Sequence, residues 1–388
     1  MILEIRQQVM LQALRKHRRL SRWELHDHTG IRPNTVGTDV AAMLEAKVVR
    51  ECQASAEGRG RPRVPLEIDD ESRHVLGLAI RPGHVEIVPM NLLGKPVGEP
   101  VSELIEQPDS IASTARRLLE SKLNSQTLNI GLSTPGFVDP IGHQILFSSA
   151  MGGNHGVSLQ PLYDAAGNLP LALENDMHAL AARWLLTHEQ DQEEDVLLVY
   201  MEDGQLGAAI LINGRPNRGC VIGGNELGHT RLPVETEKCY CGYTGCLERI
   251  GSSEFLTRQD NDPTPLAQRV LQYDGSDAAT NKMIDLLATG ISNAVNFIRP
   301  NRVVLVSELV EHSAFATRML EAIHSRVLDV IAQRTQIEMW DQPAANPSES
   351  AGWLALANFY YQGWDQYRPQ TAHEPDADTA KQAATEMA

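Results

Sequence analysis

Apolar residues recur at helical spacing near the start of the chain and predict three short helices. The first helix ends in the basic segment 15–19, where positive charge stabilises the negative end of the helix dipole. A second helix is predicted over 22–29, because Ser21 and Glu24 have the spacing of a capping box and Gly30 suits a helix C-terminus. The apolar stripe of the first helix comprises Ile2, Ile5, Val9, Met10, Ala13 and Leu14.

The third predicted helix turns an apolar face inward and a face of small and polar residues outward. Pro33 suits its first turn, and its inward stripe comprises Val36, Val40, Met43 and Leu44. Small and polar groups near a helix N-terminus can approach base edges, as in the recognition helix of a helix-turn-helix. The alternative is the surface of an ordinary three-helix unit. The predicted DNA contacts of this helix are Arg32, Pro33, Asn34, Thr35, Gly37 and Thr38.

Two strand-like segments around a glycine-arginine loop follow the third helix and predict a wing. The segment 48–51 is apolar enough for a strand, and apolar residues alternate again over 64–68. Flexible arginines on a Gly/Pro backbone can enter the negative minor groove, although such a loop can also be a plain linker. We therefore predict a winged helix-turn-helix DNA-binding domain over 1–68. Its predicted wing contacts are Arg59, Arg61 and Arg63.

The rest of the chain has the pattern of an α/β protein with two related halves. Segments 75–80 and 85–90 predict a strand hairpin, and a second strand pair is predicted over 196–200 and 208–212. Asn213 and Gly214 then give a tight-turn signal. With 388 residues, of which 42% are hydrophobic and 22% charged, the chain is long enough for two or three globular domains. Segment 365–388 has no apolar period and is predicted to be a disordered tail.

The charge distribution modifies this picture at one end. A net charge of −16 argues against a nucleic-acid-binding protein as a whole. Residues 1–66, however, hold 12 Lys/Arg and 7 Asp/Glu, a balance of +5, which leaves −21 on the remainder. A basic end on an acidic body fits a protein that meets phosphate at that end only. No apolar run has the length of a membrane span, and the N-terminus lacks a signal-peptide pattern, so we expect a cytoplasmic protein without membrane contact.

Three of the five cysteines cluster within eight residues, close to a histidine. His229, Cys239, Cys241 and Cys246 supply the four ligands of a closed tetrahedral zinc site, with no open position for catalysis. The alternative is a set of unrelated thiols and a core histidine. We predict a structural Zn²⁺ ion.

The segments around this cluster closely resemble the signature of the ROK family of repressors and sugar kinases. They read Gly-Gly-Asn-Glu-Leu-Gly-His over 223–229 and Cys-Tyr-Cys-Gly-Tyr-Thr-Gly-Cys-Leu-Glu over 239–248. Further matches are Gly-Leu-Ser-Thr-Pro-Gly over 131–136 and Glu-Asn-Asp over 174–176. The resemblance extends over about 67–360, and the winged module is typical of the regulatory members.

The resemblance implies an actin-like, ribonuclease H-like α/β fold of two lobes with a sugar in the cleft between them. Lobe 1 is expected over 69–178, and lobe 2 over 179–364 with the zinc site and C-terminal helices that return to lobe 1. Where relatives often carry an Asn, this chain has the segment 150–154, so that Asn154 or His155 replaces the contact or the contact is lost. The sugar-binding residues implied are Asn175, Asp176, Glu226, His229, Glu248 and Asn154, with His229 also a metal ligand.

Three segments that hold nucleotide in the family's kinases are altered here. The first phosphate segment reads Ala79-Ile80-Arg81-Pro82-Gly83, without the expected Asp and with bulky residues for two glycines. The second, 203–207, places Asp203 where a phosphate would lie, and a third Gly-Gly is replaced by Ser307-Glu308. We therefore expect no catalytic residue, with Asp176 vestigial.

These observations together predict a sugar-responsive DNA-binding transcriptional regulator of carbohydrate metabolism, acting as a repressor. Its expected partners are a double-stranded DNA operator, a sugar or sugar-phosphate effector, and a second copy in a homodimer or a dimer of dimers. One alternative is an active ATP-dependent sugar kinase with an accessory DNA-binding head. Another is a zinc-stabilised interaction protein that binds neither sugar nor ATP.

Overall fold

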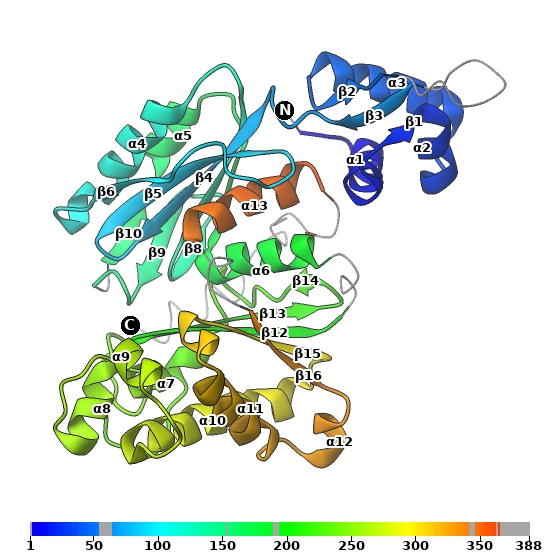
Figure 1. Cartoon of the computed structure of the whole chain (residues 1–388). Coiled ribbons are helices and arrows are strands. Elements are labelled where there is room, and N and C mark those ends of the chain that lie inside the picture. The colour runs from blue at the N-terminus through cyan, green and yellow to red at the C-terminus, as the bar shows by residue number, and fades with distance from the viewer. Residues whose placement is uncertain are drawn as a thin grey trace, which may run out of the picture.

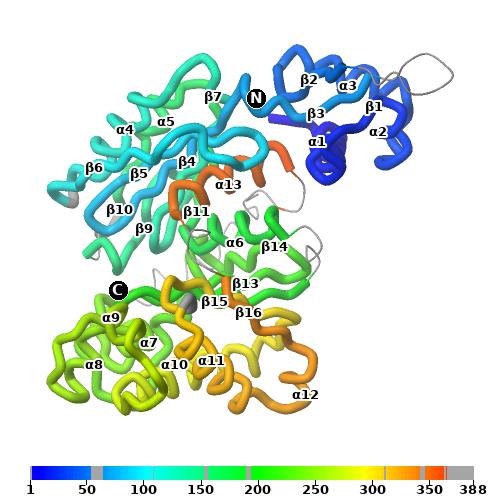
Figure 2. The backbone as a smooth tube through the Cα atoms, in the orientation of Figure 1, coloured from blue at the N-terminus to red at the C-terminus, as the bar shows by residue number. Residues whose placement is uncertain are grey.

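The computed structural model (Figures 1 and 2) describes residues 2–53, 64–152, 154–188, 194–340, 346–361 and 364. A small N-terminal head is followed by two larger units, each built on a five-stranded sheet. Two predicted features lie outside the described residues, namely the wing arginines Arg59, Arg61 and Arg63 and the tail 365–388.

The head contains the three predicted helices and the predicted strand pair. Ser21 and Glu24 form the expected capping box, and Gly30 ends the second helix with φ +68°, a conformation that glycine adopts without strain. A two-residue strand before the second helix completes an antiparallel sheet of order β1-β3-β2. The head elements are α1 (Ile5–His17), β1 (Leu20–Ser21), α2 (Arg22–Thr29), α3 (Pro33–Glu45), β2 (Val49–Glu51) and β3 (Pro65–Ile68).

The first large sheet has the order β11-β7-β4-β5-β6. Its centre, β4, pairs antiparallel with β5, as the hairpin pattern predicted, and parallel with β7. The strands are β4 (His74–Arg81), β5 (His84–Asn91), β6 (Val101–Leu104), β7 (Thr127–Thr134) and β11 (Leu171–Asn175). The accompanying elements are η1 (Pro108–Ser110), α4 (Ile111–Lys122), β8 (Phe137–Asp139), β9 (Gln144–Ser148), β10 (Asn154–Ser158) and α5 (Gln160–Ala166).

The second large sheet repeats this arrangement, with the order β14-β13-β12-β15-β16. Its centre, β12, again pairs antiparallel with the next strand and parallel with the strand on its other side. The strands are β12 (Val196–Glu202), β13 (Gln205–Ile212), β14 (Arg215–Pro216), β15 (Arg302–Val306) and β16 (Gln336–Trp340). The helices of this unit are η3 (Leu227–His229), α7 (Leu247–Ile250), α8 (Ser253–Asp260), α9 (Leu266–Leu271), α10 (Ala278–Ile298), η4 (Glu308–Glu311), α11 (Ser313–His324) and α12 (Asp329–Ala332).

Two helices lie between the large sheets, α6 (Asp176–Thr187) and α13 (Pro347–Phe359) (Figure 1). The helix α13 packs on α6 and on β4 and β7 of the first sheet. Glycine makes this close approach possible, because a Cβ atom added at Gly131 would lie 1.7 Å from the carbonyl oxygen of Ala351. Within the described residues, no helix has both the length and the apolar character needed to cross a membrane.

The head is joined to α6 and α13 by one apolar cluster and by specific contacts. The Leu3 N–H donates to the carbonyl of Phe359 at 3.2 Å, close to the end of α13. Arg15 of α1 donates to the carbonyl of Leu186, in the last turn of α6, at 2.7 Å. Its guanidinium carbon also lies 4.8 Å from the ring centroids of both Trp353 and Tyr361. The position of the head is therefore tied to both helices.

Candidate functional site

The candidate site is built around the junction of β11 and α6. Asn175 is the N-cap of α6: its Oδ1 accepts from the Met177 N–H at 2.8 Å, and its Nδ2 donates to the carbonyl of Gly136 at 2.9 Å. The predicted sugar contact Asn175 is thus already engaged in holding the helix start. Asp176 follows in the first turn, and desolvation raises the pKa of its carboxyl group. The β11–α6 junction therefore fixes this carboxyl group by backbone structure.

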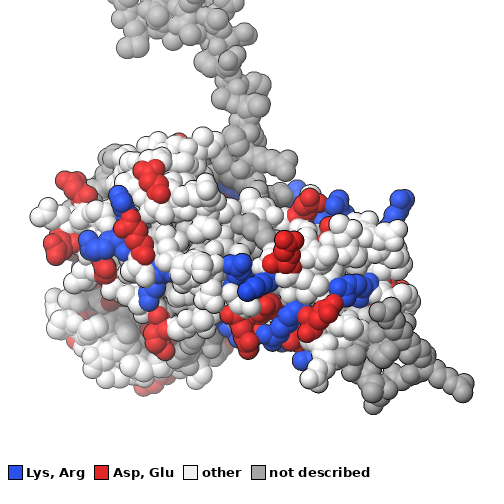
Figure 3. Space-filling model, turned by 90° about the horizontal axis from the view of Figure 1, so that it is seen from above, with Lys and Arg blue, Asp and Glu red and all other residues white. Residues whose placement is uncertain are grey.

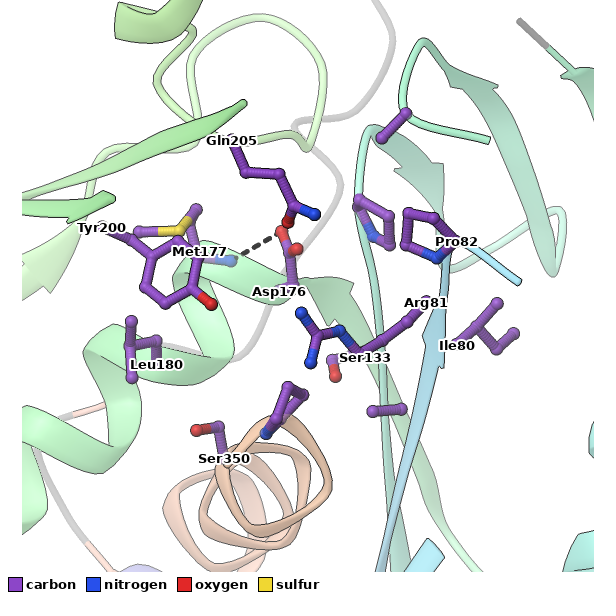
Figure 4. A pocket seen from close by; sticks show the side chains of 14 residues that line it. Ile80, Arg81, Pro82, Ser133, Asp176, Met177, Leu180, Tyr200, Gln205 and Ser350 are labelled. Carbon is purple, nitrogen blue, oxygen red and sulfur yellow. Dashed lines mark hydrogen bonds between the residues drawn. The ribbon is translucent and has the colours of Figure 1, made fainter. Parts of the chain in front are cut away.

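A cavity lies beside Asp176 (Figure 4). The Arg81 side chain reaches from the end of β4 toward Asp176, and Gln205 approaches from the start of β13. The cavity therefore lies between the two large sheets. It is lined by Ala79, Ile80, Arg81, Pro82, Ser133, Pro135, Ala150, Asp176, Met177, Leu180, Tyr200, Gln205, Pro347 and Ser350.

Glu226, His229 and Glu248 form a second polar group close to Asp176. The His229 Nε2 lies 3.3 Å from Ser149 Oγ and 3.7 Å from the Glu226 carboxylate, and its Nδ1 lies 3.5 Å from Glu248. Desolvation and the charges of Asp176 and Glu248 raise the pKa of Glu226 to about 7, although 40% of its side chain is exposed. Burial likewise raises the pKa of Glu248 to about 7. The predicted contacts Asp176, Glu226, His229 and Glu248 are thus brought together.

The predicted metal ligands also come together, at the Nδ1 side of the His229 ring, where Glu248 lies as well. The Nδ1 of His229 lies 3.6 Å from Cys239 Sγ, and the sulfur atoms of Cys241 and Cys246 are 3.6 Å apart. One ligand atom from each of the four residues lies within 4.8 Å of the other three. Three thiols and one imidazole nitrogen at these distances are a donor set that can hold a metal ion. His229 therefore connects this cluster to the polar group of the cleft.

The altered nucleotide segments take up new local roles. The Asp203 carboxylate accepts a hydrogen bond at 2.7 Å from the N–H of Ser253, the first residue of α8, and Asp203 does not line the cavity. The expectation that Asp203 lies where a nucleotide phosphate would bind stays a prediction, and in the structure its carboxylate is occupied by Ser253. The Ser307 Oγ accepts from the Leu309 N–H at 3.1 Å and caps η4.

The outward face of α3 carries the residues predicted to contact DNA. Arg32, Pro33, Asn34 and Thr38 are exposed, and Thr35 and Gly37 are half-buried. They occupy the start and first half of the helix, while its buried residues face the other head elements. Asn154, a predicted sugar contact, is the first residue of β10 (Asn154–Ser158).

Several arginines of the head are paired with carboxylates, which the sequence pattern did not indicate. Arg19 and Arg50 each donate to Glu67 at 2.8 Å, and Arg22 donates to Glu51 at 2.9 Å. The hydrogen bonds from Arg50 and Arg19 hold the pKa of Glu67 at about 2. Figure 3 shows basic and acidic side chains next to one another on the face seen from above, without one continuous basic surface. Part of the positive charge counted over 1–66 is thus neutralised by neighbouring carboxylates and cannot pair with DNA phosphates.

Two residues of the site region were missed by sequence reasoning. Ser133 lies on the buried strand β7 and lines the cavity. Arg15 was interpreted only as part of a basic helix end, yet it contacts α6 and α13. Ser133 lies within the segment 131–136 that resembles the family, but the sequence does not indicate that its side chain faces a cavity. The partners of Arg15 have no local signal, because they are distant along the chain.

Comparison with known proteins places these features in a family. The chain is 22% identical over 339 residues to the xylose repressor of Bacillus subtilis (strain 168), covering 84% of this chain and 88% of that protein. It is 24% identical over 248 residues to the N-acetyl-D-glucosamine kinase of Escherichia coli O157:H7, covering 59% of this chain and 81% of the kinase. The kinase match thus leaves more of this chain uncovered.

A solved structure supports the fold, and a family model supports membership of a protein family. A ROK family transcriptional regulator, described as a homologue of the E. coli MLC protein, superposes with a TM-score of 0.75 at 21% identity, covering 91% of this chain and 96% of that one. The predicted fold, a winged head on a two-lobed α/β body, is confirmed by this likeness. Residues 104–358 match the model described as ROK family. The chain therefore belongs to the ROK family.

Proposed function

We propose that this protein is a sugar-responsive DNA-binding transcriptional regulator that represses genes of carbohydrate metabolism. Its similarity to a xylose repressor over most of both chains supports the proposal. The observation that carries it is the physical connection between the cleft and the head. A ligand effect on DNA binding needs a structural element that responds to the ligand and also contacts the DNA-binding part.

The helix α6 is that element. Its first residue is Asp176 in the cleft, and the Leu186 carbonyl in its last turn accepts the hydrogen bond of Arg15 from the head. A 12-residue helix is about 18 Å long and moves as a rigid rod. A sugar that shifts the start of α6 on binding therefore displaces the contact at its other end.

On the DNA side, we assign the major-groove contacts to α3 and the minor-groove contacts to the wing. The residues proposed are Arg32, Pro33, Asn34, Thr35, Gly37 and Thr38, with Arg59, Arg61 and Arg63 in the wing. A winged helix reads one half-site, so two copies related by two-fold symmetry would read a palindromic operator. A homodimer or a dimer of dimers in the cytoplasm is the corresponding assembly.

On the ligand side, we assign the sugar hydroxyls to the carboxylates of the cleft and to His229. Asp176, Glu226 and Glu248 can accept hydrogen bonds from hydroxyl groups, and the Nε2 of His229 faces the same space. A Zn²⁺ ion held by His229, Cys239, Cys241 and Cys246 would fix the His229 ring from its other side. The metal role would be structural, because four protein donors leave no open position for a substrate.

The experiment that tests this function measures DNA affinity with and without ligand. Fluorescence anisotropy of the full chain on its own upstream DNA would be recorded with glucose, xylose, mannose, N-acetylglucosamine and the hexose 6-phosphates. We expect one of these ligands to change the dissociation constant by roughly 5- to 150-fold. The change should be lost in Asp176→Asn, which retains the size of the side chain. If no ligand in this panel alters DNA affinity, the proposal is wrong.

One observation favours a second function, that of an active sugar kinase. Asp176 lies beside a cavity at the place where a kinase needs a base for a sugar hydroxyl. ADP release from ATP with any of the same sugars, abolished by Asp176→Asn, would establish that activity. We expect no ADP release above background, because Arg81 replaces a small residue of the first phosphate segment and two further segments are altered.

A further inference from the structure

We propose that the cavity beside Asp176 binds the phosphoryl group of a phosphorylated sugar, with Arg81 as its counter-ion. This inference rests on the proposed function and narrows its effector to a sugar phosphate. The region that holds nucleotide phosphates in the family's kinases is then not simply lost but adapted to a phosphate that arrives on the sugar itself.

The first observation is a buried hydroxyl group that lacks a partner. The Ser133 side chain belongs to a residue that is only 1% exposed, and its Oγ makes no hydrogen bond within the described residues. Ser133 lines the cavity from the first sheet (Figure 4). An unpaired buried polar group costs about 1 to 3 kcal/mol. A ligand oxygen in the cavity would provide the missing hydrogen bond.

The second observation is the guanidinium group of Arg81 in the same cavity. In Figure 4, the Arg81 side chain extends from β4 toward Asp176 and ends near Ser133. Its ion pair with Glu202 spans the two large sheets at 3.6 Å, which is longer than a hydrogen bond. A guanidinium group has five N–H donors in a planar fork that matches a phosphate. Arg81 can therefore bind a phosphoryl group while it remains near Glu202.

The position of the cavity relative to the sugar site supports the same assignment. A kinase carboxylate contacts the hydroxyl that receives the phosphoryl group, so a phosphate on that hydroxyl must lie directly beyond Asp176. That is where the cavity lies. Pro347 and Ser350 from the first turn of α13 line it as well, so the cavity is bounded by the first sheet, by α6 and by α13. The positive charge of Arg81 opposes the carboxylates of Asp176 and Glu202.

The test compares each sugar with its own 6-phosphate by isothermal titration calorimetry on the full chain. The probes are glucose, mannose and N-acetylglucosamine, their 6-phosphates, and inorganic phosphate. We expect at least one 6-phosphate to bind roughly 10- to 100-fold more tightly than the parent sugar, as two charge-assisted hydrogen bonds would give. Inorganic phosphate should bind weakly, because it lacks the hydroxyls that the carboxylates recognise.

Variants assign the effect to the two residues. Arg81→Gln should remove the preference for the 6-phosphate over the parent sugar, whereas Arg81→Lys should retain part of this preference. Ser133→Ala, which removes only the hydroxyl, should weaken the 6-phosphate by roughly 3- to 10-fold. Arg22→Gln is the matched control, since it removes the same charge from an arginine that is paired with Glu51 in the head.

Three results would overturn the inference: equal affinity for both members of every pair, no binding of any 6-phosphate up to 10 mM, or an equal loss for sugar and phosphate in Arg81→Gln. The readout needs no DNA. A chain that binds sugar phosphates through Arg81 but fails to bind its upstream DNA would refute the proposed function and leave this inference intact. If an unphosphorylated sugar changes DNA binding and no 6-phosphate binds, the proposed function stands and this inference is refuted.

Discussion

Replacement of Arg15 by methionine should uncouple the head from the ligand. The substitution keeps an unbranched side chain but removes the guanidinium group. In the structure this group donates to the Leu186 carbonyl at 2.7 Å and lies 4.8 Å from the rings of Trp353 and Tyr361. A hydrogen bond from a charged donor contributes about 1.5 to 3 kcal/mol, and a cation over an aromatic ring contributes about 0.5 to 2 kcal/mol.

Because these terms overlap, we expect Arg15→Met to weaken the docking of the head by about 2 to 4 kcal/mol. Coupling free energies between two sites are usually about 1 to 3 kcal/mol, so a loss of this size is enough to abolish the ligand response. The ligand should change DNA affinity by less than about threefold in the variant. Anisotropy on the upstream DNA measures this response, and calorimetry on the same sample should show unchanged ligand affinity.

Lys16→Met is the matched control, because it removes one positive charge from the neighbouring, exposed position of the same helix. Lys16→Met should retain the full ligand response. Each variant removes one positive charge from α1, so any loss of DNA affinity that is due to charge alone should be equal in the two. The role of the docking contact is refuted if Arg15→Met responds to ligand as strongly as the wild type does. An equal loss of response in Lys16→Met would also refute it.

Further predictions concern the metal cluster, the packing of α13 and the acid stability of the head. Cys241→Ser should release the metal and lower the unfolding temperature. Cys220→Ser, at an exposed and isolated position, should do neither. Metal analysis and thermal unfolding of the two variants measure these effects. Gly131→Ala should destabilise the fold by at least about 1 to 3 kcal/mol in urea unfolding, because its Cβ atom would meet the α13 backbone. Gly37→Ala, with open space around the added methyl group, should not destabilise it. The pKa of Glu67 is lowered from 4.5 to about 2. The contribution of its ion pairs to the free energy of unfolding is therefore fully present above pH 4.5 and is lost as the pH falls toward 2. Glu67→Gln should remove that pH dependence from acid unfolding. The stabilisation lost is below about 3 kcal/mol, because the partner Arg19 is largely exposed to solvent.

Local signals in the sequence were sufficient for much of the fold. The capping pair Ser21 and Glu24 and the stop at Gly30 placed the second helix correctly, because helix ends are specified by residues only a few positions apart. The turn at Asn213 and Gly214 was also readable, since both residues adopt positive φ angles that a tight hairpin needs. The repeated strand order of the two sheets needed the structure, because strand pairing across long separations has no local signature.

The site was predictable only where its residues lie in short motifs. The cluster of His229 and the three cysteines spans 18 residues, and its members were found by spacing alone. In contrast, the hydrogen bonds that Asp203 accepts from Ser253 at the start of α8 had no signal in the sequence, because the two residues are 50 positions apart. The partners of Arg15 are likewise distant, with Leu186 lying 171 residues along the chain. Such contacts depend on how the units are packed, which no local pattern records.

The contact between Leu3 and Phe359 has a consequence for the time course of synthesis. The head can form its own three helices and sheet as soon as its residues leave the ribosome, since domains generally fold as units from the N-terminus. Its docking surface needs Trp353 and Tyr361, which belong to the last described part of the chain. A growing chain therefore acquires a DNA-binding surface early and the means to control it last. A chain on a ribosome stalled before residue 347 would carry the head without its docking surface on α13.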